Sequence, residues 1–273
     1  MIEPSPFWIA YLTLLSFFFG ACIGSFLNVC IYRIPEGLSV VTPRSRCPKC
    51  LTPIEWYDNI PLLGWLRLKG KCRACGVAIS PRYFLVELLT GTLFLMVWNH
   101  YGFDMRTPIF WIAISGLILG TFVDFDHMII PDRVSLGGQV IGLLCSVAFP
   151  VLHGKETHVE GAITSAIGLA VGFGSLWIVG YLGKLAFKKD AMGFGDVKLL
   201  GAMGAFLGWQ GVLFIIMLSS LLGTVAGVSM IVTGHKEMQS RIPFGPYLSL
   251  AAVIWILGGH TWWTAYVNWI GGM

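Results

Sequence analysis

The sequence predicts an all-α polytopic membrane protein with about eight transmembrane helices and a small cytoplasmic domain between the first two. Only 12% of the 273 residues are charged and 56% are hydrophobic, whereas soluble domains carry about 25% charged residues. The apolar runs are long and do not alternate with polar residues, which argues against a β-barrel. One polar block, residues 33–82, holds nine of the eighteen Lys and Arg residues. These observations favour a helical bundle interrupted by one polar domain.

A spanning helix needs about 20 mostly apolar residues, and one such run precedes the polar block. It follows no basic segment and is too long for a cleaved signal peptide. Pairs of glycines four residues apart, Gly20 with Gly24 and Gly204 with Gly208, favour close helix packing. The predicted spans are residues 7–32, 83–101, 107–123, 134–151, 161–183, 197–209, a seventh from a tight turn at Gly208–Gly211 to about 233, and an eighth from about 247 to 264.

The basic residues predict the orientation of these spans. If residues 33–82 are cytoplasmic, the loops at 124–133, 184–198 and 234–246 are cytoplasmic too. These four regions hold sixteen of the eighteen Lys and Arg residues (nine, one, four and two). Because cytoplasmic loops carry an excess of Lys and Arg, we expect the N-terminus to lie outside.

The polar block contains two Cys-x-x-Cys pairs, Cys47 with Cys50 and Cys72 with Cys75, separated by 21 residues. Each pair can form a zinc knuckle, a turn that directs both thiolates to one ion. Two knuckles complete a tetrahedral four-thiolate zinc site of the zinc-ribbon kind, with no open position for catalysis. Disulfides or redox pairs are the alternative, but a cytoplasmic position disfavours disulfides. The surrounding basic residues fit contact with anionic membrane lipid. We expect no nucleic-acid partner, because aromatic residues do not interleave with the basic ones.

Two acidic segments lie on the predicted cytoplasmic side, one containing Asp124 and Asp126 and the other Asp196 behind Gly193 and Gly195. Carboxylates at span ends usually face a cavity or a partner, and two close carboxylates share a proton, which suits acid–base catalysis on an amide. On a helix, residues two apart point to different sides, so only one of the first two joins such a pair. Alternatively, Asp196 caps a helix and the others are solvated.

The ordered set of motifs resembles the type IV prepilin peptidases, membrane aspartic proteases with a Gly-x-Gly-Asp motif. The resemblance covers nearly the whole chain and implies that Asp124 and Asp196 are the catalytic pair and that the four cysteines bind zinc. The motifs are Gly24–Val29, both Cys pairs, Asn59–Leu62, Arg82–Glu87, Asp124–His127, Ile130–Asp132, Gly193–Leu199 and Pro243–Tyr247.

The resemblance also implies substrates and a second activity. The enzyme would cleave the short basic leader of type IV prepilins and type II secretion pseudopilins at the inner face of the bacterial inner membrane. It would then methylate the new N-terminal amine with S-adenosylmethionine. In that reading residues 1–32 are the first span, 33–82 the zinc domain associated with methyl transfer, and 83–273 the peptidase domain with about seven spans. Asp126 and Asp132 are candidates for contact with the basic leader.

The methyl-transfer residues are not assigned by any motif, because no glycine-rich cofactor fingerprint is present. The region from Gly24 to Glu87 is the best candidate. Glu87 lies just inside the second predicted span, and the alternative for it is an ion pair with Arg82 about one turn away. Two other functions stay open at this point, an ion-coupled transporter, which would place carboxylates near the bilayer middle, and a membrane scaffold docked through the zinc domain.

Overall fold

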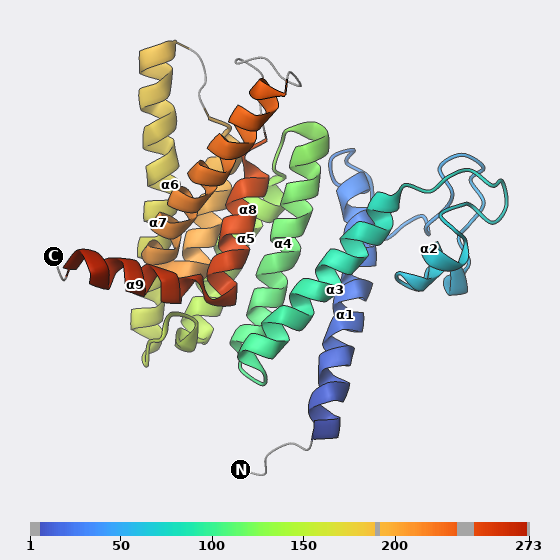
Figure 1. The fold of residues 1–273 in the computed structure, drawn as a ribbon, viewed down its shortest axis with the longest axis horizontal. Coiled ribbons are helices and arrows are strands. Elements are labelled where there is room, and N and C mark those ends of the chain that lie inside the picture. The colour runs from blue at the N-terminus through green and yellow to red at the C-terminus, as the bar shows by residue number, and fades with distance from the viewer. Residues whose placement is uncertain (1–5, 189–191, 234–242, 272–273) are drawn as a thin grey trace. The chain divides into compact units, whose positions relative to one another are not determined.

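The structure, a computed structural model, describes residues 6–188, 192–233 and 243–271 and is built from helices (Figure 1). No β-strand occurs among these residues, where the polar block contributes only two isolated β-bridges, so the all-α prediction is confirmed. Parts of the predicted loops 184–198 and 234–246 lie outside the described residues. The elements are α1 (Pro6–Arg33), η1 (Trp56–Asp58), α2 (Leu63–Arg67), α3 (Pro81–Tyr101), α4 (Arg106–His127), α5 (Asp132–Ala148), η2 (Pro150–His153), α6 (His158–Phe187), α7 (Phe194–Val232), α8 (Gly245–Ile254), η3 (Trp255–Gly259) and α9 (His260–Gly271).

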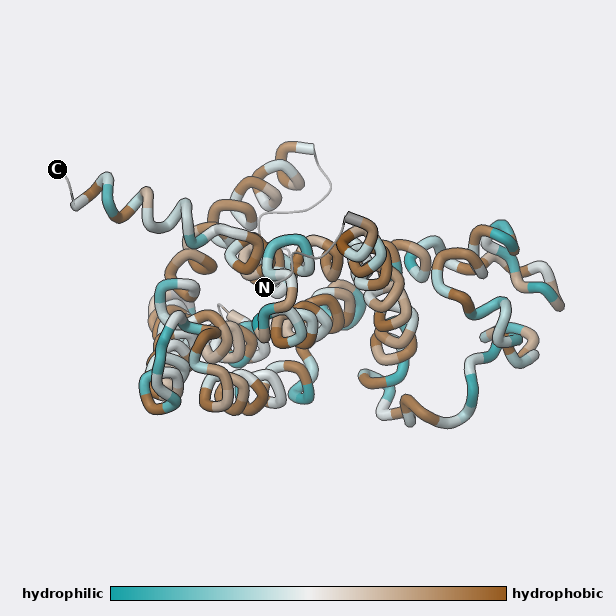
Figure 2. The backbone as a smooth tube through the Cα atoms, turned by 90° about the horizontal axis from the view of Figure 1, so that it is seen from below, coloured by the Kyte–Doolittle hydropathy of each residue, from teal (hydrophilic) through white to brown (hydrophobic). Residues whose placement is uncertain are grey.

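Four described helical segments are long and apolar enough to cross a membrane: Phe7–Arg33, Arg106–His127, His158–Ala186 and Phe194–Val232. Hydrophobic residues follow the helices, and hydrophilic residues gather in the segment between α1 and α3 (Figure 2). The other helices are shorter or carry more polar residues, so length and composition do not confirm the predicted number of eight spans. Four helices of this length and apolar composition are typical of a polytopic membrane protein.

The chain divides into two compact units, Met1–Leu119 and Gly120–Met273. In the first unit α1 packs along α3. A Cβ added at Gly20 would lie 2.7 Å from Cβ of Phe94, and one at Gly24 would lie 2.8 Å from Cα of Glu87. The close packing predicted for this glycine pair is therefore confirmed. The ring of Phe94 also stacks on Trp111, with 4.9 Å between the centroids.

In the second unit α7 packs against α5, α6 and α8. Its Gly204 lies against the backbone carbonyl of Gly168 on α6, where a side chain would have no space. The predicted tight turn at 208–211 is wrong in detail: helical geometry is interrupted only at Gly208, whose φ is 73° and ψ 174°. A positive φ of this kind is readily adopted by glycine, so one residue suffices to bend the chain here.

The last predicted span, 247–264, consists of two helices. Helical geometry is lost at Leu257 and at Gly258, where φ is 120°, and α9 then turns away from α8 (Figure 1). Helix α9 buries no residue and exposes Trp262 and Trp269. Exposed tryptophans of this kind are typical of the membrane–water interface. The prediction of one continuous eighth span is therefore wrong.

Candidate active site and metal centre

Asp124 lies in the last turn of α4, and its residue exposure is only 5%. Its Oδ2 accepts a hydrogen bond from the backbone N–H of Gly245, with 3.1 Å between nitrogen and oxygen. A Cβ at Gly245 would lie 2.8 Å from the same oxygen, so the first residue of α8 must lack a side chain for this contact. Asp126 is exposed, which confirms that the two aspartates point to different sides of the helix.

Asp196 is the third residue of α7. The helix is capped by Gly193 and no side chain completes the cap, so the alternative that Asp196 caps this helix does not describe the structure. Its Oδ1 is buried and has no hydrogen-bond partner among the described residues. A buried oxygen without a partner is costly. This carboxyl group is therefore available to a molecule that enters the site.

Three segments converge on these two carboxyl groups within the second unit. Asp124 and Asp196 lie near enough for the charge of one to act on the other. Ile130, from the α4–α5 connection, packs against the glycines beside both of them: its Cδ1 lies 3.1 Å from the Cβ position of Gly245, and its Cβ lies 3.2 Å from that of Gly195. A carboxyl pair of this kind can share one proton and act as acid and base together.

Contacts between α5 and α7 hold the start of α7 in place. Lys198 Nζ forms an ion pair with Asp132 Oδ1 at 2.6 Å, and Gln139 Nε2 donates to the carbonyl of Lys198 at 2.9 Å. These contacts fix the backbone two residues after Asp196. Sequence reasoning missed them, and it also gave Gly245 no role although the Pro243–Tyr247 motif contains it.

The four cysteines of the polar block gather in the first unit. Their sulfur atoms all lie within 4.8 Å of one another, with 3.9 Å from Cys47 to Cys75 and 3.9 Å from Cys50 to Cys72. A disulfide needs about 2.05 Å, so the disulfide alternative does not fit. A tetrahedral ion with metal–sulfur bonds of about 2.3 Å separates its sulfur ligands by roughly 3.8 Å. The cluster therefore fits a metal ion such as zinc.

The two Cys pairs are presented by similar turns. Cys47 N–H donates to Thr52 and Cys72 N–H donates to Val77. The residue after the second cysteine adopts a left-handed backbone in each turn, Leu51 with φ 60° and Gly76 with φ 70°. This arrangement directs both thiols of a pair to one side, as a knuckle requires.

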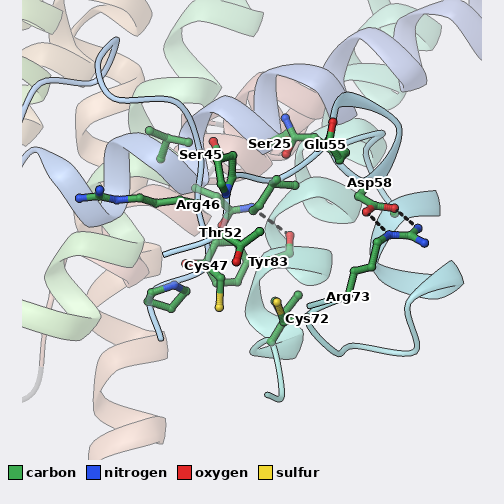
Figure 3. Close-up of a pocket in the computed structure, with 18 of the residues that line it drawn as sticks. Ser25, Ser45, Arg46, Cys47, Thr52, Glu55, Asp58, Cys72, Arg73 and Tyr83 are labelled. Carbon is green, nitrogen blue, oxygen red and sulfur yellow. Dashed lines mark hydrogen bonds and ion pairs between the residues drawn. The ribbon is translucent and has the colours of Figure 1, made fainter. Parts of the chain in front are cut away.

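A cavity of about 960 Å³ lies beside this cluster in the first unit, and Cys47 and Cys72 both contribute to its wall (Figure 3). Asp58 on the same wall accepts two hydrogen bonds from Arg73, at 2.6 and 2.5 Å. The Arg73 guanidinium holds the pKa of the Asp58 carboxyl below its usual range. Glu87 enters the wall from α3, and its Oε2 accepts from the backbone N–H of Leu62 at 2.8 Å. The partners that the structure gives to Glu87 are therefore Leu62 and Ser25, in place of the alternative ion pair with Arg82.

Comparison with known proteins agrees with the motifs. The model of the bacterial peptidase A24 N-terminal domain matches residues 18–101, and that of the type IV leader peptidase family matches residues 111–228. No solved structure matches the chain.

Three relatives share the name prepilin leader peptidase/N-methyltransferase. The Myxococcus xanthus protein is 41% identical over 82% of this chain, which covers 65% of that relative, slightly less than two thirds. The Aeromonas salmonicida protein is 38% identical over 90% of this chain and 91% of the relative. The Pseudomonas aeruginosa protein is 36% identical over 92% of each. The chain therefore belongs to the type IV leader peptidase family.

Proposed function

We propose that this protein cleaves the short basic leader from type IV prepilins and type II secretion pseudopilins and then N-methylates the new N-terminal residue. The observation that carries the peptidase half is the convergence of Asp124 and the unpartnered Oδ1 of Asp196 inside one unit. The methyl-transfer half is supported by the name that the relatives share.

In the proposed cleavage, the aspartate pair activates water. One carboxylate accepts a proton from the water molecule while the oxygen of that water attacks the amide carbon. The other carboxyl group protonates the carbonyl oxygen of the substrate. The C–N bond then breaks and a proton passes to the leaving amine. The pair titrates as a unit, so neither proton is assigned to one residue. The unpartnered Oδ1 of Asp196 supports this role, because an acceptor of this kind binds water without displacing another contact.

Glycines near the pair make room for the two carboxyl groups. A Cβ at Gly193 would lie 2.9 Å from Asp196 Oδ2, and one at Gly245 would lie 2.8 Å from Asp124 Oδ2. The family preference is a glycine before the cut and often phenylalanine after it. The acidic side chains of Asp126 and Asp132 attract the basic leader in this proposal.

The proposed topology has about eight spans in the bacterial inner membrane, with the N-terminus outside and the aspartates at the cytoplasmic face. Residues 33–82 form a cytoplasmic zinc-ribbon-like domain and residues 83–273 the peptidase domain. The excess of Lys and Arg in residues 33–82, 124–133, 184–198 and 234–246 supports this orientation. Cys47, Cys50, Cys72 and Cys75 would hold zinc, which would cross-link the two knuckles and stabilise the domain. S-adenosylmethionine would supply the methyl group.

The ion-coupled transporter and the membrane scaffold are not favoured. Both candidate aspartates lie within one turn of a helix end, whereas a transporter site lies near the bilayer middle. A scaffold gives no reason to bury a carboxyl group without a partner.

Mass spectrometry of a prepilin incubated with the purified chain tests the proposal. With S-adenosylmethionine present, we expect the leader to be lost and the mature product to be one methylene heavier. Without it, cleavage alone is expected. An intact prepilin in both reactions would refute the peptidase function, and a cleaved product that never gains mass would refute the methyl transfer.

A further inference from the structure

The cavity beside the cysteine cluster has the size and the lining of a ligand site. Its volume of about 960 Å³ lies at the upper end of the roughly 300–1,000 Å³ that small-molecule sites occupy. It is lined by residues of α1, α3 and the segment between them, all within the first unit. This volume accommodates a nucleoside-sized molecule together with the end of a peptide.

Glu87 is the buried carboxyl group of this cavity, with a residue exposure of 9%. Among the described residues its partners are the Leu62 amide and the hydroxyl of Ser25, both of them neutral. Gly24 allows α1 to approach α3 at this point, because any Cβ there would lie 2.8 Å from Cα of Glu87. A buried carboxylate that lacks a cationic partner is costly, and a cationic ligand would offset that cost.

Of the other charged groups of the cavity wall, Arg46, Lys49 and Glu55 are exposed, whereas Asp58 and Arg33 have partners within the first unit. Asp58 is held by Arg73 through two hydrogen bonds. The guanidinium of Arg33 donates to the carbonyls of Ser39 and Pro43 at 2.9 and 2.8 Å. Glu87 is therefore the buried carboxylate of this wall whose charge a ligand would meet.

Aromatic rings complete a lining that suits cations. Those of Tyr32, Tyr57, Trp65 and Tyr83 belong to the wall. Aromatic faces attract cations and also stack on nucleobases. Both reactants of an N-methylation by S-adenosylmethionine carry positive charge, the sulfonium and the terminal ammonium, so carboxylate and rings together fit this pair of reactants.

We propose that this cavity is the site of methyl transfer and that Glu87 binds the N-terminal amine that accepts the methyl group. The inference rests on the proposed function and assigns its second activity to particular residues. The bound ammonium first loses one proton to water. The neutral amine then uses its lone pair to form the new N–C bond while the bond from methyl carbon to sulfur breaks and its electron pair stays on sulfur. The methylated nitrogen then carries a positive charge, which Glu87 offsets, and it loses one proton to water.

Two variants of the full chain separate amine binding from binding of the methyl donor. Glu87→Gln keeps an acceptor for the Leu62 amide but removes the charge. We expect methylation to fall roughly 10- to 150-fold, the range for losing a hydrogen bond to a charged group, while S-adenosylhomocysteine still binds in calorimetry. Val29→Trp fills the cavity from α1 and should abolish that binding. The matched controls are Glu36→Gln, an exposed acid outside the wall, and Phe26→Trp, which lies 50% exposed on α1.

Leader cleavage by each variant reports whether the chain is folded, and a label on the native chain gives a second test. Ultraviolet irradiation with radiolabelled S-adenosylmethionine should attach the label between residues 25 and 87. Native methylation by Glu87→Gln, native binding by Val29→Trp, or a label elsewhere would overturn the inference. If a variant loses cleavage as well, the position of the label on the native chain decides whether the cavity is the site that binds S-adenosylmethionine. A native chain that cleaves but neither methylates nor binds S-adenosylhomocysteine would instead refute the methyl-transfer half of the proposed function.

Discussion

Replacement of Gly245 by alanine should slow leader cleavage without unfolding the protein. The added Cβ would lie 2.8 Å from Asp124 Oδ2 and 3.1 Å from Ile130 Cδ1, so the carboxyl group must move away from the backbone N–H that now donates to it at 3.1 Å. A hydrogen bond to a charged group contributes about 1.5–3 kcal/mol. At about 1.36 kcal/mol per tenfold change in rate, its loss predicts cleavage slowed roughly 10- to 150-fold.

The assay is the initial rate of leader removal from a prepilin whose leader ends in glycine, measured together with thermal unfolding. Gly245 has no positive φ, so alanine adds no backbone strain, and the unfolding midpoint should fall only by what the lost hydrogen bond and the new contact cost, with the chain still folded at the assay temperature. Gly137→Ala on α5 is the matched control, because a Cβ there meets nothing within 4 Å. A Gly245→Ala protein that cleaves at the native rate would refute the role of this contact in positioning Asp124.

Three further outcomes are expected. Cys47→Ser should lower the zinc content measured by elemental analysis and impair methylation more than cleavage; equal loss of both at normal protein levels would show that the metal domain also supports the protease. Charge reversal at Asp126 should weaken processing of basic leaders but not of a neutral leader, whereas reversal at Asp132 should slow both because it also breaks the ion pair with Lys198; unchanged kinetics on the basic substrate would count against leader contact. Gly204→Ala should lower the free energy of unfolding by about 1–3 kcal/mol, because its Cβ would meet the carbonyl of Gly168; an unfolding midpoint like that of the native chain would contradict this packing.

The helical architecture followed from the sequence because apolar length and glycine spacing are local properties. Gly20 and Gly24 stand on the face of α1 that meets α3, as a four-residue spacing predicts. The positions at which helices are interrupted were harder to predict from the sequence. One residue, Gly208, interrupts α7 where a four-residue turn was expected, and Leu257 with Gly258 separates α8 from α9. A glycine in a helix interior does not by itself reveal whether its φ is positive, because packing decides this.

The candidate sites followed from the sequence only in part. The spacing of the cysteine pairs predicted a cluster, since each pair folds locally into one turn. The supporting contacts join residues far apart in the chain, such as Gly245 with Asp124 and Lys198 with Asp132. No local sequence pattern predicts such pairs. Exposure of Asp126 beside buried Asp124 was predictable, because helical geometry alone sets it.

The most direct test of the central claim is leader cleavage in membranes by Asp124→Asn and Asp196→Asn at matched expression. Glu156→Gln, which removes an exposed acid from the α5–α6 connection, serves as the control. If the two aspartates activate water together, the native chain and the control remove the leader and both asparagine variants leave the prepilin intact. Cleavage by both asparagine variants at the native rate would contradict the account and leave the two acidic segments without a catalytic role.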